Sequence, residues 1–267
     1  MNMYKFELKM FKRSILIWGS AISFGLIFYM MFFPLIMVEN DAMDQVMQSF
    51  PEEFLAFFGM NASLTFTNVM GYFGLTMSFI YIPVAIQAAL YGISILSVEE
   101  REFTADFLLS KPVSRSQIYI SKFLAALTAL VIVNIVVWIS GYLSLLFFSS
   151  GLEVDYLGAT LVLCSLIFIQ LFFLTLAMLI SVVVKKVTSV IGYAMGLGFG
   201  MFILSSFGQM LSLDILKLFT PYSHFEPISI LVDKTFNFPI VLISVAVIII
   251  SFSLGFYLYQ RKNIKAL

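Results

Sequence analysis

The sequence predicts an all-α polytopic membrane protein, a single transmembrane domain over residues 1–267 that crosses the bilayer six times. Composition gives the first indication, because 61% of the residues are hydrophobic and only 11% are charged, whereas soluble domains carry about 25% charged residues. Secondly, several uncharged stretches reach the length of about 20 residues that a membrane helix needs. Thirdly, short charged segments separate these stretches, as expected of a chain that returns to water between crossings.

A charged lead-in, residues 2–13, precedes the first apolar stretch at 14–38. In a helix its basic side chains fall within about a quarter of a turn, and they are Lys5, Lys9, Lys12 and Arg13. We expect an interfacial helix that lies on the inner leaflet before the first span. The alternative is an ordinary positive flank that fixes topology.

The next element is an outer loop at 39–68, in which Pro51 precedes a short amphipathic helix, and it leads to the second span at 69–97. The stretch 54–68 carries no charge, so it is either an outer interfacial helix or a re-entrant helix. A polar insert over 98–117 follows the second span. The other expected elements are spans at 118–149, 156–184, 187–213 and 237–260, an outer loop at 214–236, and a cytoplasmic tail at 261–267.

The distribution of Lys and Arg predicts the orientation. Of the 15 basic residues, all but Lys217 and Lys234 lie on the side that holds the two termini and the polar insert. Positive charge favours the cytoplasmic side. We therefore expect both termini in the cytoplasm of a bacterial cell, with the protein in its plasma membrane.

The apolar stretches hold no ionisable side chain, which argues against an ion-coupled carrier or a pump. Their main polar residues, Gln87, Asn134 and Gln170, are expected to join helices by hydrogen bonds rather than to bind substrate. The sequence also has no phosphate-binding loop, zinc-protease motif or serine-hydrolase motif. We expect no catalytic residue and no directly bound cofactor, and the zero net charge suggests no nucleic-acid partner.

The single histidine, His224, lies close to Glu226 in the last outer loop. Such a pair could form a metal or proton site, but a hydrogen bond that anchors the loop is the interpretation we favour. We therefore expect no metal site.

The insert over 98–117 has its own amphipathic order. Phe103, Phe107 and Leu108 recur at helical spacing, which predicts a short helix. Pro112 ends this helix because the residue before a proline is disfavoured in helical conformation, and Ser114 is expected to cap the third span. An element joined to two spans in this way can convert a push from the cytoplasm into movement of the helices.

The stretch EEREFTADFLLSKPVSR, Glu99 to Arg115, resembles the signature of ABC-2-type exporter permeases. That pattern runs from an acidic start through G-T-x-[ED]-x-L-L-S-x-P-V-S-R to a hydrophobic residue and a lysine, here Ile118 and Lys122. The chain departs from it at Phe103, where the family usually has glycine.

This resemblance implies an ABC-2 (type V exporter-like) fold with a cytoplasmic coupling helix between the second and third spans. It also implies a second permease subunit, identical or paralogous, and two copies of a cytoplasmic ABC ATP-binding subunit that hold the ATP and Mg. Carried over by position, the resemblance implies that an acidic hinge, an apolar knob and a polar clamp would contact the ATP-binding subunit and couple it to this chain. The residues concerned are Glu99, Glu100, Arg101, Phe103, Asp106, Phe107, Leu108, Pro112 and Arg115.

Gly192, Gly196 and Gly200 recur every four residues in the fifth span, which allows close helix approach. This row is either a seam between two subunits or an intramolecular contact with the second span near Gly71 and Gly74.

The expected function is the permease subunit of an ABC exporter. The 30 Phe and 15 Met residues offer an adaptable surface, which favours hydrophobic or amphipathic cargo such as a peptide, antimicrobial, lipid or drug. The alternative is an ATPase-coupled sensor or mechanotransmitter that moves no cargo.

Overall fold

The computed structural model describes residues 2–38, 49–57, 68–101 and 113–261 of the chain. The expected short helix of the polar insert and most of the apolar stretch at 54–68 lie outside these residues. Six helices in the described part are long and apolar enough to cross a membrane. This count agrees with the six spans that the sequence predicts.

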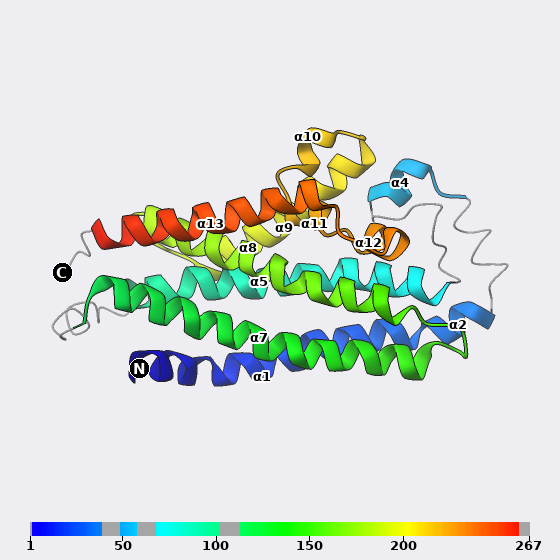
Figure 1. Ribbon diagram of the computed structural model, residues 1–267, viewed down its shortest axis with the longest axis horizontal. Helices are drawn as coiled ribbons and strands as arrows, with labels where there is room; N and C mark the ends of the chain where they lie inside the picture. Colours follow the sequence, from blue (N-terminus) through cyan, green and yellow to red (C-terminus); the bar gives the residue numbers. More distant parts are fainter. Residues whose placement is uncertain (1, 39–48, 58–67, 102–112, 262–267) are drawn as a thin grey trace.

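The long helices form an elongated bundle with both ends of the described chain at the same end (Figure 1). They are α1 (Asn2–Met31), α5 (Val69–Arg101), α7 (Arg115–Phe148), α8 (Tyr156–Val183), α9 (Val190–Met210) and α13 (Phe238–Arg261). We call the end that holds Asn2, Arg101, Arg115 and Arg261 the terminal end, and the opposite one the loop end. The most extensive contacts join α1 to α7 and α5 to α8, and α5 is the most buried of the six helices.

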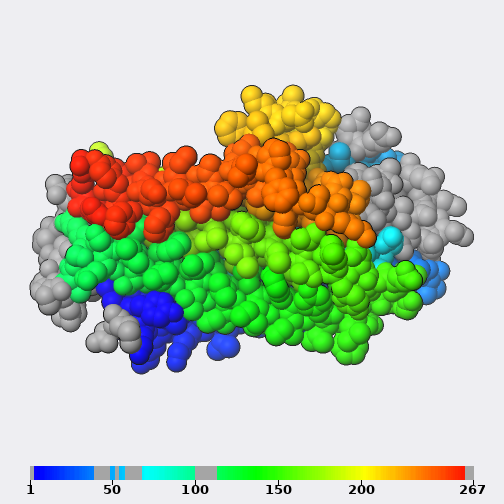
Figure 2. All heavy atoms as spheres, viewed as in Figure 1, coloured from blue at the N-terminus to red at the C-terminus, as the bar shows by residue number. Residues whose placement is uncertain are grey.

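Among the described residues, five short helices lie toward the loop end (Figure 1). They are α2 (Phe33–Val38), α4 (Glu52–Phe57), α10 (Asp214–Lys217), α11 (Pro221–His224) and α12 (Pro227–Asp233). The helix α4 follows Pro51, where the sequence predicts one. The loop expected at 214–236 is therefore largely helical, and its first part projects from the side of the bundle (Figure 2).

The helix starts follow from local chemistry. Ser114 caps α7 as predicted: its hydroxyl accepts from the Gln117 backbone, and the Gln117 side chain accepts from the Ser114 backbone. Asp155 caps α8, and its carboxylate accepts from the backbone N–H of Leu157 and Gly158. The Asp155 side chain also pairs with Lys234 at 2.9 Å. These contacts lower the pKa of Asp155, chiefly through the hydrogen bond from Lys234.

The lead-in does not form a separate helix, contrary to expectation. Residues 2–13 are the first turns of α1, which runs unbroken to Met31. Packing accounts for the difference, because Tyr4 Oη lies 3.0 Å from Thr128 Oγ1 of α7 and draws the lead-in against the bundle. The four basic side chains of the lead-in are exposed, on the side turned away from these contacts. That they rest on a membrane surface stays a prediction.

The polar residues inside the bundle bond to one another, as predicted. Asn134 Nδ2 donates to Gln170 Oε1 at 2.6 Å, and Gln170 Nε2 lies 3.5 Å from Gln87 Oε1. Gln87 Nε2 in turn donates to Tyr91 Oη, which lies 2.9 Å from Ser14 Oγ. This chain of contacts joins α7, α8, α5 and α1 through buried side chains.

His224 anchors its loop, which is the interpretation favoured from the sequence. Its Nδ1 lies 2.6 Å from Ser244 Oγ of α13, and its Nε2 lies 3.1 Å from the carbonyl oxygen of Leu218. Burial lowers the pKa of His224, which keeps the ring neutral at physiological pH. Glu226 makes a separate contact, accepting from Ser229 Oγ at 2.7 Å.

Candidate functional site

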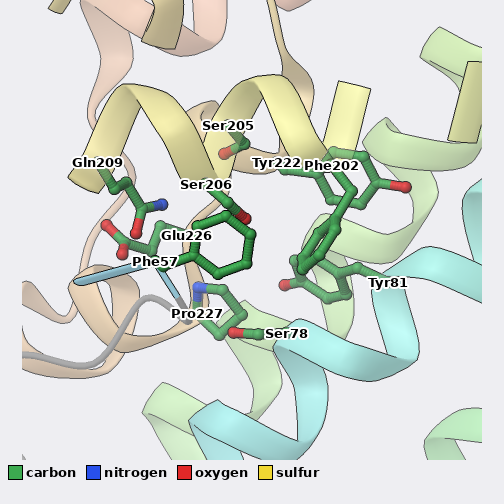
Figure 3. A pocket seen from close by; sticks show the side chains of 10 residues that line it. All are labelled: Phe57, Ser78, Tyr81, Phe202, Ser205, Ser206, Gln209, Tyr222, Glu226 and Pro227. Carbon is green, nitrogen blue, oxygen red and sulfur yellow. The ribbon is translucent and has the colours of Figure 1, made fainter. Parts of the chain in front are cut away.

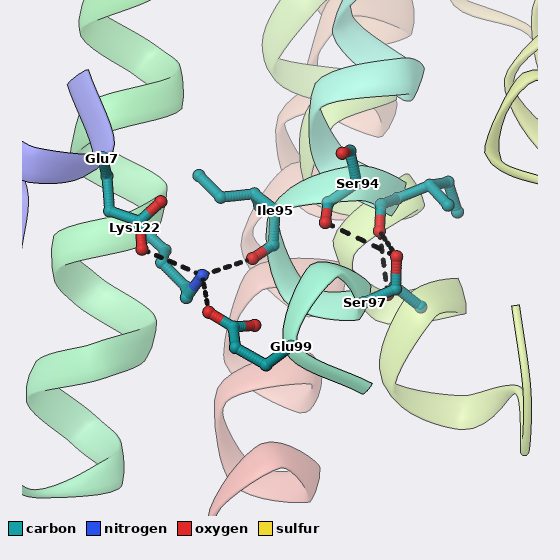
Figure 4. A network of polar contacts seen from close by, with 8 residues as sticks. Glu7, Ser94, Ile95, Ser97, Glu99 and Lys122 are labelled. Carbon is teal, nitrogen blue, oxygen red and sulfur yellow. Dashed lines mark hydrogen bonds and ion pairs between the residues drawn. The ribbon is translucent and has the colours of Figure 1, made fainter. Parts of the chain in front are cut away.

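A buried lysine lies where the polar insert joins the bundle at the terminal end. Lys122 lies at the end of the second turn of α7, which begins at Arg115, and its side chain is fully buried. Its ammonium donates to the carbonyl oxygen of Ile95 at 2.6 Å. It also pairs with Glu99 Oε1 at 2.5 Å and with Glu7 Oε1 at 3.0 Å (Figure 4). The three donors of the ammonium therefore have three oxygen partners.

These contacts connect three helices through one side chain. Glu7 comes from α1, Glu99 from the last turns of α5, and Lys122 from α7. We call these residues the Lys122 triad. Glu99 lies at the start of the polar insert and Lys122 follows its end, so the triad holds both ends of the insert together and ties them to the first helix.

The triad is nearly removed from water, with side-chain exposures of 0% for Lys122, 11% for Glu7 and 15% for Glu99. Burying a charge is costly unless it is paired and hydrogen-bonded. Each member of the triad therefore depends on the others, and movement of one helix against another at this point would separate charges.

The triad corrects the expectation that the spans hold no ionisable side chain. That expectation was drawn from the charge-free stretches alone, although the span expected at 118–149 already contains Lys122. The helix α5 also continues beyond the expected 69–97 to Arg101. Glu99 lies in the added turn of α5, where it meets Lys122 of α7 inside the bundle. Their charges meet each other there, so the helices could extend without leaving a charge unpaired.

The start of α7 is also fastened to the end of α13. Arg115 Nη1 donates to the carbonyl oxygen of Gln260 at 3.2 Å, and Gln260 Nε2 donates to Ser116 Oγ at 3.1 Å. One turn further, the buried Tyr119 packs against Phe252 and neighbouring aromatic rings of α13. The polar clamp assigned to Arg115 thus has a contact inside this chain.

The other predicted coupling residues are placed as follows. Glu99 lies within the last turns of helix α5 and belongs to the triad, and its role as part of an acidic hinge stays a prediction. Glu100 and Arg101 end α5. Phe103, Asp106, Phe107, Leu108 and Pro112 lie outside the described residues.

Sequence reasoning gave Lys122 no role beyond matching the family pattern, and it overlooked Glu7. The signal for Glu7 was present, because it is the one acidic residue among the four basic ones of the lead-in. In a helix it points almost opposite to them. A lone carboxylate on the face that packs inward requires a buried cation, and Lys122 provides it.

The glycine row on α9 faces outward in the single chain. A Cβ added to Gly196 or Gly200 would meet nothing within 4 Å, whereas one added to Gly198 would lie 2.5 Å from Ile86 Cγ1 of α5. The close contact between α9 and α5 therefore uses Gly198 and not the row. Exposed apolar side chains accompany the row, and they are Ile191, Met195, Phe199 and Ile203.

Six apolar helices with charged residues gathered at their ends define a multi-pass membrane protein. Residues 1–264 match the family described as ABC-2 family transporter protein. The chain therefore belongs to the ABC-2 transporter family, and it is a membrane transport subunit of the permease type. No curated protein sequence matches the chain.

Proposed function

We propose that this protein is the permease subunit of an ABC exporter, driven by a separate ATP-binding subunit that docks on residues 98–117. The observation that supports this most is the Lys122 triad, which gives the docking segment a rigid attachment at both ends. ATP and Mg belong to the partner, and this chain supplies no catalytic group. The terminal end is cytoplasmic in this proposal, because it gathers the Lys and Arg residues.

The triad gives a physical route for the energy of ATP binding. Closure of two ATP-binding subunits would press on the insert of each permease and displace the ends of α5 and α7 together. Glu7 would then carry the displacement into α1, because its carboxylate is paired with Lys122 at 3.0 Å. The same helices would pack in two ways, one inward-facing and one outward-facing. The pathway would switch when ATP binding changes the relative stability of these two packings.

The first prediction concerns the docking segment. Replacing both Phe107 and Leu108 by aspartate is expected to abolish co-purification of the ATP-binding subunit in mild detergent, because two charges would enter an apolar contact. The matched control replaces the exposed Lys185 and Lys186 by aspartate, in the turn between α8 and α9 at the same end. Equal recovery of the partner with both double variants would contradict docking at the insert.

Export is distinguished from signal transmission by flux. The complex in sealed vesicles should accumulate an amphipathic peptide or drug in an ATP-dependent manner. Stimulated ATP hydrolysis with no movement of any tested cargo would favour the mechanotransmitter instead.

The second subunit is proposed to pack on the glycine row of α9. Small residues at this spacing let membrane helices approach closely, and a Cβ at Gly196 or Gly200 would meet nothing within 4 Å in the single chain. Hydrophobic or amphipathic cargo would then pass between two permease subunits. Without a second subunit, this exposed face of α9 would lie against lipid.

A second prediction tests this seam. Replacing Gly196 and Gly200 by leucine is expected to leave the fold of one chain intact, because a Cβ at either position meets nothing within 4 Å. The mass of the particle in detergent should fall from two permease subunits to one, as measured by light scattering. A particle of unchanged mass would rule out the seam. Co-purification of differently tagged copies separates an identical partner from a paralogue.

A further inference from the structure

A small cavity lies at the loop end, away from the Lys122 triad, and it combines a carboxylate with aromatic walls. Its volume is about 30 Å³, which is the size of a small polar group rather than of a whole cargo molecule. Gln209 and Glu226 lie beside each other at one side of it, and the rings of Tyr81, Phe202 and Tyr222 lie at the other (Figure 3).

Three of the hydroxyl groups around this cavity already donate their protons elsewhere. Tyr222 Oη donates to the Gly198 carbonyl at 3.2 Å and Tyr81 Oη to that of Val162 at 3.3 Å. Ser78 Oγ donates to the carbonyl oxygen of Gly74 at 3.1 Å. What these side chains can still offer a ligand is lone pairs and ring faces. Together with the Glu226 carboxylate, these oxygen atoms favour a ligand that donates hydrogen bonds.

Glu226 adds a negative charge with unused acceptor capacity. A carboxylate can accept about four hydrogen bonds, and Ser229 accounts for one. Among the described residues no cation lies within ion-pairing distance of Glu226, and the nearby Lys217 is paired with Asp214 at 3.0 Å. Burial raises the pKa of Glu226, an effect that the hydrogen bond from Ser229 and the charge of Lys217 partly offset. A partly buried carboxylate in this situation is stabilised by a bound cation.

We propose that this cavity binds an ammonium group, held by the Glu226 carboxylate and by the surrounding oxygen lone pairs and aromatic faces. An alkylammonium donates hydrogen bonds and accepts none, which suits these acceptor groups. Its charge is also attracted to the faces of aromatic rings. The cavity admits the ammonium alone, so the remainder of the molecule extends outside it. The ammonium can belong to a lipid headgroup or to an amphipathic cargo, and the proposal holds whether or not the insert docks an ATPase.

The test uses methylammonium as the probe and the whole protein in detergent. Ligand-observed saturation-transfer NMR should show saturable binding that methanol, a neutral molecule of similar size, does not displace. Glu226→Gln keeps the shape of the side chain and should weaken binding at least about tenfold, the effect of losing a hydrogen bond to a charged group. Glu153→Gln, an exposed carboxylate at the same end, is the matched control and should bind as the wild type does.

Equal binding to Glu226→Gln and the wild type would overturn the proposal, as would displacement by methanol. The methanol arm needs no variant, so it decides the question even if Glu226→Gln folds poorly. Nanodiscs then separate the two sources. Binding that is blocked by phosphatidylethanolamine but not by phosphatidylglycerol identifies a lipid headgroup, and binding in both membranes identifies a free amine. Absence of saturable binding in both membranes would also overturn it.

Discussion

Replacing Lys122 by methionine is expected to destabilise the protein by about 3–5 kcal/mol, the usual cost of removing one partner from a buried ion pair. The substitution leaves Glu7 and Glu99 as two carboxylates of like charge with little access to water. The melting temperature in detergent, followed by circular dichroism, measures the loss. Lys186→Met is the control, because Lys186 is exposed at the same end of the bundle.

A triple variant separates stability from coupling. Adding Glu7→Gln and Glu99→Gln to Lys122→Met removes the unpaired charges, so the triple variant should regain most of the lost stability. It should not regain stimulation of the partner's ATP hydrolysis, because the charge link between the insert and α1 is gone. If Lys122→Met alone melts at the wild-type temperature, the triad contributes little to the stability of the protein. A triple variant with full stimulation would show that the energy takes another route.

Replacing Gly92 by alanine is expected to push α5 and α8 apart. The added Cβ would lie 2.5 Å from the carbonyl oxygen of Leu174 and 3.0 Å from the backbone nitrogen of Met178. Backbone atoms cannot move aside as a flexible side chain can. The cost of such overpacking is typically about 1–3 kcal/mol and sometimes more, and α5 and α8 form one of the two most extensive helix pairs.

The control for Gly92 is Gly196→Ala, because the same change at Gly196 meets open space. The yield of monodisperse protein and its melting temperature should fall for Gly92→Ala and stay unchanged for Gly196→Ala. Similar behaviour of the two variants would contradict the close approach of α5 and α8.

The spans could be predicted from the sequence because the bilayer requires long apolar segments and places charge outside them. The ends of the helices could not be predicted in the same way. Glu99 and Lys122 each look like residues that belong in water. Only together, from helices that meet in space, do they satisfy each other inside the bundle.

The role of the glycines shows the same limit. Spacing identifies Gly192, Gly196 and Gly200 as a row that allows close approach, yet it cannot say which partner approaches. The intramolecular contact falls instead on Gly198, which lies outside the row and against Ile86. The cavity beside Glu226 was equally hidden, because its walls come from α4, α5, α9, α11 and the start of α12.

The pairing of α1 with α7 bears on how the protein is assembled during synthesis. The helix α1 leaves the ribosome before α5 and α7, but Tyr4 meets its hydrogen-bond partner Thr128 only 124 residues later. Glu7 likewise waits for Lys122. A nascent chain that has inserted only its first two spans therefore carries an unneutralised carboxylate and an uncovered helix face. Arrival of the third span completes the packing of the first, so the order of insertion differs from the order of assembly.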